Sequence, residues 1–328
     1  MALFLSNEDV ERILKPKEVV EVMRVALKDY GLKRALNSPR IRLPLSEGIF
    51  RSMMSTIPSL DVAGLKQGMW LSSEKEGRTK DVERRTELVS VYSISEGRLL
   101  AIINSHRLNE LRTAAASAIA TECLAKKGAA SVGIIGTGPH ALAHLEVLGD
   151  VIKLEEFWVY SRSGENRAKF LEAARPITTA KGVEVQTPRE AVSKADIVVE
   201  ATYSRTPVLL GEWIKPGTHI NSIGSSFAGK QVIDDSLFKR VSCYVVDFKE
   251  QALLDNSGDI LNPISKGIFS YTDIIELGEV VAGVRSGRKR EDDITLYKSL
   301  GMGLFDVCAA YAAYKKALET GVGAKLPA

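Results

Sequence analysis

Three small residues at a fixed spacing follow a run of apolar residues near the middle of the chain. Val132 to Ile135 lead into Gly136, Gly138 and Ala141, and an Ala- and Leu-rich stretch comes next. The first glycine permits a tight turn, the second lets backbone N–H groups approach a pyrophosphate, and the alanine lets a helix pack closely on a strand. Because it stands between an expected strand and an expected helix, the pattern predicts a dinucleotide-binding turn. The residues expected to line the phosphates are Gly136, Thr137, Gly138, Pro139, His140 and Ala141.

The end of the next apolar run indicates which dinucleotide is bound. An Asp or Glu there normally binds the ribose hydroxyls of NAD, but in this chain residues 157–160 lead into Ser161, Arg162 and Ser163. A guanidinium with two hydroxyls suits a 2′-phosphate better than a bare pair of hydroxyls. NADP(H) is therefore favoured as the cofactor, with NAD(H) as the alternative if Arg162 is only a solvated loop residue.

The histidines and cysteines do not follow the spacing of metal sites. His140 and His144 lie one helical turn apart, but no Glu stands where an HExxH motif would have it. Cys123, Cys243 and Cys308 are far apart and lack a CxxC spacing. We therefore expect neither a metal nor a disulfide framework, and a reducing compartment.

The pattern of apolar residues predicts the elements that carry these motifs. Two amphipathic helices, the first capped by Ser6, open the chain, and short stretches of near-alternating polarity between Arg40 and Ala101 predict an antiparallel sheet. An Ala-rich helix begins at about Glu110 and stops at Gly128, and the apolar runs that follow it predict βαβ units around a parallel sheet. Residues 296–319 are interpreted as one long helix that returns to the first domain.

Length and composition indicate a globular protein of two domains. The chain has 328 residues, of which 45% are hydrophobic and 26% charged, with a net charge of +3, so neither a nucleic-acid partner nor a membrane is expected. The fold class is α/β: a Rossmann-type NAD(P)-binding domain, residues 113–302, and an α+β domain with an antiparallel sheet, residues 1–112 with 303–328. The charged N-terminus is unlike a signal peptide and predicts a cytoplasmic protein.

Several segments together resemble the ornithine cyclodeaminase and mu-crystallin family, which includes archaeal alanine dehydrogenases and ketimine reductases. They are ELRTAAASAIA, VVEATYSRTPVL, GTHINSIGSSFAGK and LYKSLGMGLFD, and the resemblance runs nearly from end to end. It implies a homodimer whose subunits meet through the N-terminal sheet and the C-terminal helix, so that residues 1–112 with 303–328 would form the substrate-binding and dimerisation domain. It also implies an active site in the cleft between the domains.

The resemblance implies that Lys66 and Arg112 hold the carboxylate of the substrate, a task for which a lysine and a bidentate arginine are also chemically suited. One hairpin arginine completes this pocket. Arg42 has the spacing to Lys66 found in cyclodeaminases, whereas Arg51 resembles an arginine of an archaeal alanine dehydrogenase, so both stay in the predicted site. Lys66 is the expected proton donor. Ser299 and Leu300 are expected to flank the nicotinamide, with Leu300 also at the substrate, and the remaining cofactor contacts are Thr202, Ser222, Ile223 and Lys230.

One catalytic position departs from part of the family. Ser226 stands where cyclodeaminases and the archaeal alanine dehydrogenase carry an Asp, and mu-crystallin and related cyclic-imine reductases also have Ser there. A carboxylate shuttles protons near neutral pH, which a hydroxyl does not do unaided. The expected activity is therefore NAD(P)H-dependent reduction of small cyclic imines, ketimines such as pyrroline-2-carboxylate, to amino acids. The alternatives are an NAD-dependent alanine or other amino-acid dehydrogenase, then an ornithine cyclodeaminase, and a mu-crystallin-like NADPH-dependent ligand-binding protein.

Overall fold

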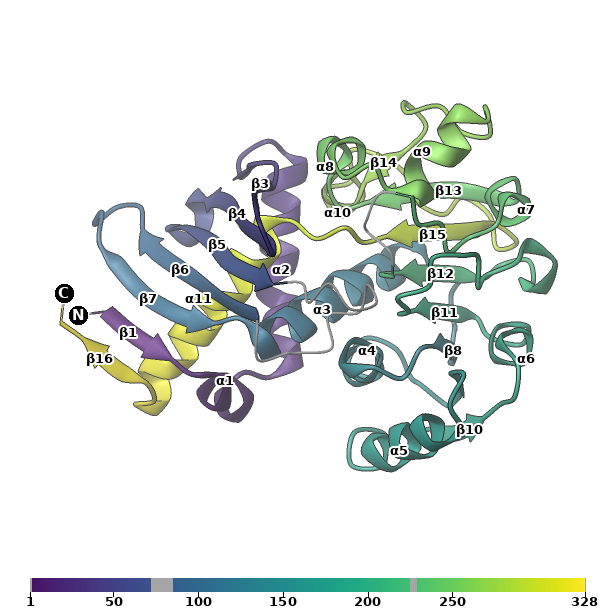
Figure 1. Ribbon diagram of the computed structural model, residues 1–328, viewed down its shortest axis with the longest axis horizontal. Helices are drawn as coiled ribbons and strands as arrows, with labels where there is room; N and C mark the ends of the chain where they lie inside the picture. The colour runs from purple at the N-terminus through teal and green to yellow at the C-terminus, as the bar shows by residue number, and fades with distance from the viewer. Residues whose placement is uncertain (1, 72–84, 225–228, 328) are drawn as a thin grey trace. The chain divides into compact units, whose positions relative to one another are not determined.

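The computed structural model describes residues 2–71, 85–224 and 229–327 of the 328-residue chain (Figure 1). It divides into two compact units, Met1–Arg112 with Met302–Ala328, and Thr113–Gly301. The predicted α/β class, with one parallel sheet and one largely antiparallel sheet, is confirmed. The substrate-binding and nucleotide-binding roles expected of the two domains stay predictions.

The sheet of the first unit has the strand order β16-β1-β7-β6-β5-β4-β2, and β3 pairs with β4. Neighbouring strands are antiparallel, except that β1 runs parallel to β7. The long central strands alternate between buried and more exposed residues, as expected for a sheet covered on one face. The strands are β1 (Ala2–Leu5), β2 (Leu36–Asn37), β3 (Ile41–Leu45), β4 (Gly48–Ile57), β5 (Val62–Leu71), β6 (Arg85–Ser93), β7 (Leu99–Asn104) and β16 (Ala324–Leu326).

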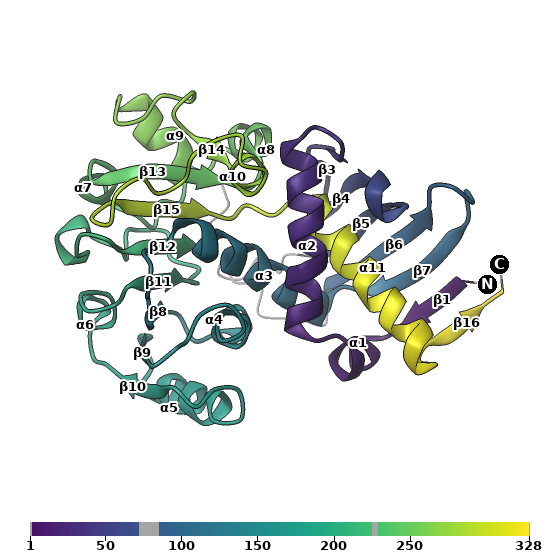
Figure 2. The same ribbon diagram turned by 180° about the vertical axis from the view of Figure 1, so that it is seen from behind.

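Three helices accompany this sheet: α1 (Asn7–Ile13), α2 (Pro16–Gly31) and α11 (Gly303–Thr320). Helix α11 packs against β4, β5 and β6, and α2 packs on α11, as Figure 2 shows from behind. Gly64 of β5 lets α11 approach closely, because a Cβ there would lie 3.1 Å from a methyl group of Val307. Ser6 caps α1 as predicted, with its hydroxyl accepting a hydrogen bond from the N–H of Asp9 at 3.1 Å.

The second unit is built around a parallel sheet of strand order β10-β9-β8-β11-β12-β15-β13-β14. Figures 1 and 2 show α4 and α5 on one face of this sheet and α6 and α7 on the other. Its central strands are buried along their whole length, as expected for strands covered on both faces. The strands are β8 (Ser131–Ile135), β9 (Glu156–Tyr160), β10 (Lys181–Glu184), β11 (Ile197–Glu200), β12 (His219–Ser222), β13 (Val241–Val246), β14 (Ile275–Glu276) and β15 (Ile294–Lys298). The helices are α4 (Pro139–Leu148), α5 (Gly164–Ala174), α6 (Pro188–Val192), α7 (Asp235–Phe238), α8 (Lys249–Leu254), α9 (Gly258–Ser265) and α10 (Leu277–Val281).

Two predicted helices differ from the structure. The interpretation of residues 296–319 as one helix was wrong, because Ile294–Lys298 forms strand β15 and the helix begins only at Gly303. Strand β15 is buried between β12 and β13, which favours an extended backbone over a helical one. Gly301, with φ +79°, then separates this extended segment from the helix. The Ala-rich helix is α3, His106–Leu124, which begins earlier than predicted and crosses the boundary between the units. Among the described residues, no helix has the length and apolarity to cross a membrane.

Candidate active site

The register of the antiparallel sheet brings charged residues of three strands onto one face. Arg51 on β4 lies opposite Gly68 on β5, and Gly68 lies opposite Glu87 on β6. Because Gly68 has no side chain, the two charged residues reach across it, and Nε of Arg51 donates to Oε1 of Glu87 at 3.1 Å. A Cβ at position 68 would lie 2.6 Å from Cγ of Glu87, so this contact requires glycine. Arg42 lies opposite Arg51 in the β3–β4 hairpin.

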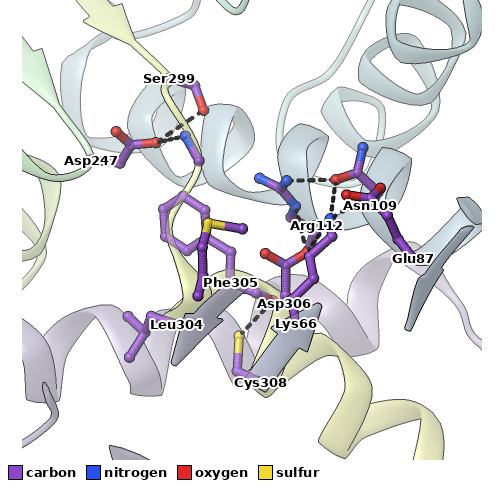
Figure 3. Close-up of polar contacts among 12 residues, drawn as sticks. Lys66, Glu87, Asn109, Arg112, Asp247, Ser299, Leu304, Phe305, Asp306 and Cys308 are labelled. Atoms are coloured by element: carbon purple, nitrogen blue, oxygen red, sulfur yellow. Dashed lines mark hydrogen bonds and ion pairs between the residues drawn. The ribbon is translucent and has the colours of Figure 1, made fainter. Parts of the chain in front are cut away.

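Lys66, two residues before Gly68, lies on the same face and is 2% exposed. Its Nζ donates to Oδ1 of Asn109 on α3 at 2.8 Å and to Oδ1 of Asp306 on α11 at 3.0 Å. Arg112, one turn after Asn109, has its Nε 3.2 Å from the same oxygen of Asp306. Figure 3 shows Lys66 and Arg112 converging on the Asp306 carboxylate. Residues distant in the sequence thus form one buried cluster.

The ring of Trp70 supports two of the arginines. The guanidinium carbon of Arg51 lies 3.5 Å from the centroid of this ring, and that of Arg85 lies 4.3 Å from it. Arg85 also donates from Nε to Oε2 of Glu87 at 2.8 Å. Stacking and pairing together fix the orientation of the Arg51 guanidinium, which a bidentate contact with a carboxylate requires.

These side chains form what we call the cationic cluster: Arg51, Lys66, Arg85, Glu87, Arg112 and Asp306. Four basic groups face two carboxylates, so two positive charges are left uncompensated within the cluster. Burial lowers the pKa of Lys66 to about 8, although Asp306 and Glu87 oppose that effect. Burial alone would raise the pKa of Glu87, but Lys66, Arg51 and Arg85 hold it well below its usual range. The cluster is therefore suited to bind a small carboxylate and to hand over a proton near neutral pH.

The glycine-rich turn stands in the second unit where the sequence predicted it, between β8 and α4. Gly136 has φ +111°, and its N–H donates to the carbonyl of Tyr160 on β9 at 2.9 Å. A Cβ at Gly138 would meet no atom of the described residues within 4 Å, so among these residues nothing closes the backbone before α4 to a ligand. Ala141 is fully buried at the start of α4. An open backbone at a helix N-terminus fits the pyrophosphate of a dinucleotide.

The loop after β9 presents Arg162 with an exposed side chain. The flanking serines shape the loop: Oγ of Ser161 donates to the carbonyl of Ser163 at 3.0 Å, and Ser163 caps α5 by accepting from the N–H of Asn166. Arg167 is buried and donates from Nη1 to the carbonyl of Ser161 at 2.7 Å. The loop is thus held by Arg167 while Arg162 extends from it.

A set of fully buried polar side chains lies at the carboxyl ends of β11, β12 and β15. Oε1 of Glu200 accepts from the hydroxyl of Thr202 at 2.7 Å, and Oε2 accepts from the hydroxyl of Ser222 at 2.9 Å. Lys298 donates to the Ser222 hydroxyl at 3.1 Å and pairs with Asp259 at 2.8 Å. Burial raises the pKa of Glu200. The hydroxyls of Thr202 and Ser222, both predicted cofactor contacts, are therefore engaged with Glu200.

Asp247, at the end of β13, anchors the segment that follows β15. Its Oδ2 accepts from the N–H of Leu300 at 2.8 Å, from the N–H of Gly301 at 2.6 Å and from the hydroxyl of Ser299 at 3.2 Å (Figure 3). Asp247 is fully buried. A carboxylate that accepts these three hydrogen bonds fixes the backbone of Leu300 and the side chain of Ser299, the two residues predicted to flank the nicotinamide.

His144, the second of the two spaced histidines, lies in the core of the second unit. His144 is buried, with Nδ1 2.6 Å from the carbonyl of His140 and Nε2 2.9 Å from Oγ of Ser117. Burial lowers the pKa of His144 to about 4, so its ring is neutral at pH 7 and packs as part of the core. In the described parts of the chain, His, Cys, Asp and Glu side chains form no group of three or more that could hold a metal ion.

The model of the ornithine cyclodeaminase/mu-crystallin family matches residues 1–321 of the chain. The chain belongs to this family. The match extends over both the glycine-rich turn and the cationic cluster. The family membership predicted from the sequence motifs is therefore confirmed.

Family members with named activities cover the whole length of the chain. The alanine dehydrogenase of Archaeoglobus fulgidus is 33% identical over 325 residues, which is 99% of this chain and 98% of the relative. The structure of Thermococcus litoralis Δ1-pyrroline-2-carboxylate reductase in complex with NADH and L-proline matches with a TM-score of 0.90 and 33% identity, and covers 99% of this chain and 100% of that one. An archaeal alanine dehydrogenase dimer with bound NAD matches with a TM-score of 0.89 and 32% identity, and covers 99% and 98% of the two chains. This member of the ornithine cyclodeaminase/mu-crystallin family is thus an oxidoreductase.

The structure brings together the basic residues that the sequence singled out and adds their acidic partners. Sequence reasoning missed Glu87 and Asp306 around Lys66, and it missed Glu200, Asp259 and Lys298 in the second unit. The available signal was a charged residue within an otherwise apolar stretch, as in ELVSVYS, LGMGLFD and ITLYK.

The predicted residues near the end of β12 are only partly described. The N–H of Ile223 donates to the carbonyl of Glu200 at 2.9 Å. Lys230 is partly exposed, and its burial together with Arg205 lowers its pKa. Ser226 lies outside the described residues, so its role stays a prediction from the sequence.

Proposed function

We propose that the protein is an NAD(P)H-dependent reductase of C=N bonds that lie next to a carboxylate, with small cyclic ketimines such as pyrroline-2-carboxylate as substrates. The observation that carries this proposal is the cationic cluster, in which two buried and two partly buried basic groups face two buried carboxylates. A small anion would offset the excess charge. The 33% identity to a pyrroline-2-carboxylate reductase supports the same substrate class.

In this proposal the arginines of the cluster bind the substrate and Lys66 moves a proton. Arg51 and Arg112 offer planar forks to the carboxylate, which orients the adjacent C=N bond. The Lys66 ammonium, whose pKa is about 8, donates a proton to the imine nitrogen when the substrate arrives neutral. The bound dinucleotide supplies the hydride that the imine carbon accepts. The product is an amino acid, and Lys66 regains its proton from water.

The residues of the second unit fit a dinucleotide, and Arg162 favours the 2′-phosphorylated form. The open backbone at Gly138 and the N-terminus of α4 suit the pyrophosphate. The exposed guanidinium of Arg162, at the end of β9, would pair with a 2′-phosphate. We therefore propose a preference for NADP(H) over NAD(H).

A second candidate function is an amino-acid dehydrogenase. The 33% identity to the Archaeoglobus alanine dehydrogenase favours it specifically. The same cluster would hold the carboxylate of alanine or pyruvate, but this reaction must also add free ammonia. Ser226, where the archaeal alanine dehydrogenase carries an Asp, favours the reductase, because a hydroxyl is a poorer proton shuttle than a carboxylate.

We also propose that the protein is a homodimer, as the archaeal alanine dehydrogenase is in its structure. The exposed face of the antiparallel sheet supports this proposal. It carries apolar side chains that the register places on the side opposite α11, and these are Leu36, Met54, Leu65, Met69 and Tyr92.

A steady-state comparison of substrates tests the proposed activity. We expect the highest kcat/KM with pyrroline-2-carboxylate or piperideine-2-carboxylate and NADPH, and no proline from ornithine with NAD. Pyruvate plus ammonia should be used much more slowly. Proline and ammonia formed from ornithine in equal amounts would refute the reductase, and faster turnover of pyruvate with ammonia would favour the dehydrogenase instead.

Arg162→Ala tests the cofactor preference. Loss of a charge-assisted contact costs about 1.5–3 kcal/mol, so NADPH affinity should fall at least about tenfold while NADH affinity stays unchanged. Fluorescence titration of the reduced cofactors measures both. Arg175→Ala, which removes an exposed arginine at the end of α5, should change neither. Equal affinities of the unmodified protein for NADPH and NADH would contradict the preference.

A further inference from the structure

Asp306 is a buried carboxylate in the first turn of α11 to which neither the sequence motifs nor the proposed reaction assigns a role. Its side chain is fully buried. The helix begins at Gly303, whose small size allows it to lie against Met53 and Met54 of β4. The first turn of α11 is thus held against the sheet, and Asp306 is held with it.

One oxygen of Asp306 bridges the two cations that are expected to bind the substrate. Oδ1 lies 3.0 Å from Nζ of Lys66 on β5 and 3.2 Å from Nε of Arg112 on α3 (Figure 3). Among the described residues, Oδ2 accepts no hydrogen bond. Oδ1 of Asn109 also accepts from both cations, from Nζ of Lys66 at 2.8 Å and from Nη2 of Arg112 at 2.5 Å. Of these two bridging oxygens, that of Asp306 is the one that carries a negative charge.

We infer that Asp306 is a positioning residue that holds Lys66 and Arg112 at the spacing a substrate carboxylate requires and keeps the Lys66 side chain in its ammonium form. The part of this inference that concerns turnover rests on the proposed function. The part that concerns Lys66 itself does not.

The groups around Lys66 single out Asp306 as its main counter-charge. Arg112 from α3 and Arg51 from β4 repel the ammonium, whereas Asp306 and Glu87 of β6 attract it. Glu87 lies 3.8 Å away and is shared with two arginines. Without Asp306, the carboxylate left near Lys66 among the described residues would be the more distant Glu87, and it would face two guanidinium groups as well as the ammonium. Its neutral form would then be favoured at neutral pH.

Loss of the ammonium would impair both tasks assigned to Lys66. A neutral amine neither attracts the substrate carboxylate nor supplies a proton to the imine nitrogen. In the proton transfer, an N–H bond of Lys66 breaks and one forms on the imine nitrogen, which makes the imine carbon a better acceptor for the hydride that a bound dinucleotide would supply. Activity therefore requires protonated Lys66 and should fall as the pH rises through its pKa.

Asp306→Asn tests the inference by two independent readouts. The first is the titration of Lys66 in the substrate-free protein, followed by NMR of labelled lysine side chains and assigned with Lys66→Met. Because the lost charge stabilised the ammonium, we expect the pKa of Lys66 to fall by about 1–3 units. The second readout is the alkaline limb of kcat/KM, which should move to lower pH by the same amount. Asp306→Glu keeps the negative charge, so the pKa of Lys66 in this variant should lie close to its value in the unmodified protein.

Asp196→Asn is a matched control, because Asp196 bridges Lys126 and Lys215 at 2.7 and 2.9 Å in the second unit. It also removes a carboxylate held by two cations, but it should leave the Lys66 titration unchanged. A folded Asp306→Asn protein with the unmodified Lys66 titration would overturn the inference. An equal shift of the Lys66 pKa in Asp196→Asn would also overturn it. If no imine is reduced by the unmodified protein, the proposed function fails, while the titration still decides the role of Asp306.

A double variant keeps the test valid if Asp306→Asn does not fold. Removing one partner of a buried pair leaves an uncompensated charge, whereas removing both does not. Asp306→Asn combined with Lys66→Met should therefore fold even where Asp306→Asn alone does not, and it should be the more stable of the two to denaturant where both fold. Equal or lower stability of the double variant would contradict the pairing.

Discussion

At the residue scale, the two hairpin arginines differ in how far they are buried. They lie opposite each other on the same face of the sheet. The side chain of Arg51 is 12% exposed, stacked on Trp70 and paired with Glu87, whereas Arg42, on the outer strand of the hairpin, is only half-buried. A group that must present a planar fork to a substrate benefits from such support. We therefore expect Arg51, rather than Arg42, to bind the substrate carboxylate.

The comparison of Arg51→Lys with Arg42→Lys tests this choice. Both variants keep the positive charge and lose the planar guanidinium group that can form a bidentate contact. We expect Arg51→Lys to lower kcat/KM for the ketimine more than tenfold, and Arg42→Lys to change it by about twofold, the effect of a typical surface substitution of about 0.5 kcal/mol. Steady-state kinetics measures both. A larger loss in Arg42→Lys would reverse the assignment.

At the element scale, the turn between β8 and α4 contains two glycines that serve different purposes. Gly136 has φ +111°, and a Cβ there would collide with the backbone of Ala201. Gly138 has an ordinary extended backbone, and in the described part of the chain no atom lies within 4 Å of the place that a Cβ would take. The fold therefore requires the first glycine, whereas only a ligand close to the backbone requires the second.

Gly136→Ala should accordingly lower the stability of the protein, whereas Gly138→Ala should weaken cofactor binding. Gly136→Ala should reduce the free energy of unfolding by about 1–3 kcal/mol, because it combines strain at positive φ with a steric clash. Gly138→Ala should stay within about 1 kcal/mol of the unmodified protein and still bind NADPH at least tenfold more weakly, because its methyl group would occupy the place of the pyrophosphate. Denaturant unfolding and cofactor fluorescence separate the two effects. Undiminished NADPH binding by Gly138→Ala would remove this turn from the cofactor site.

At the scale of the whole molecule, the antiparallel sheet has one covered face and one exposed face. Helix α11 covers the first. On the second, Leu36 is 66% exposed and Met54 is 44% exposed. Contiguous apolar side chains on the surface of a folded unit are typical of a protein–protein contact, which agrees with the proposed dimer.

Met54→Lys should weaken the proposed dimer. In a two-fold symmetric contact the new charge enters the interface twice. We therefore expect the dissociation constant of the dimer to rise at least tenfold, which corresponds to a loss of about 1.4 kcal/mol of association free energy. Sedimentation velocity over a range of concentrations measures this. Leu254→Lys, at a side chain that is 57% exposed on α8 in the second unit, should leave the dimer intact. An unmodified protein that is monomeric at every concentration would refute the dimer itself.

The sequence by itself determined the features that depend on neighbouring residues. The turn at Gly136, the buried strand before it, the cap at Ser6 and the alternation along β5 and β6 follow from local conformational preferences and from the period of the apolar residues. The family motifs also identified the cationic residues Lys66 and Arg112. A local signal was misleading at residues 296–298, where burial inside the parallel sheet prevailed over a helix-like composition.

Only the tertiary structure decided the partners of these residues. Asp306 contacts Lys66 across 240 positions of sequence, and Lys298 reaches Ser222 across 76. The contact between Arg51 and Glu87 depends on two strand registers and on the missing side chain of Gly68. A shift of one residue in either register would turn one of the charges to the opposite face. Such pairings arise from the packing of whole elements, which is why the family resemblance singled out Arg51, Lys66 and Arg112 but neither Arg85 nor the two carboxylates of the cluster.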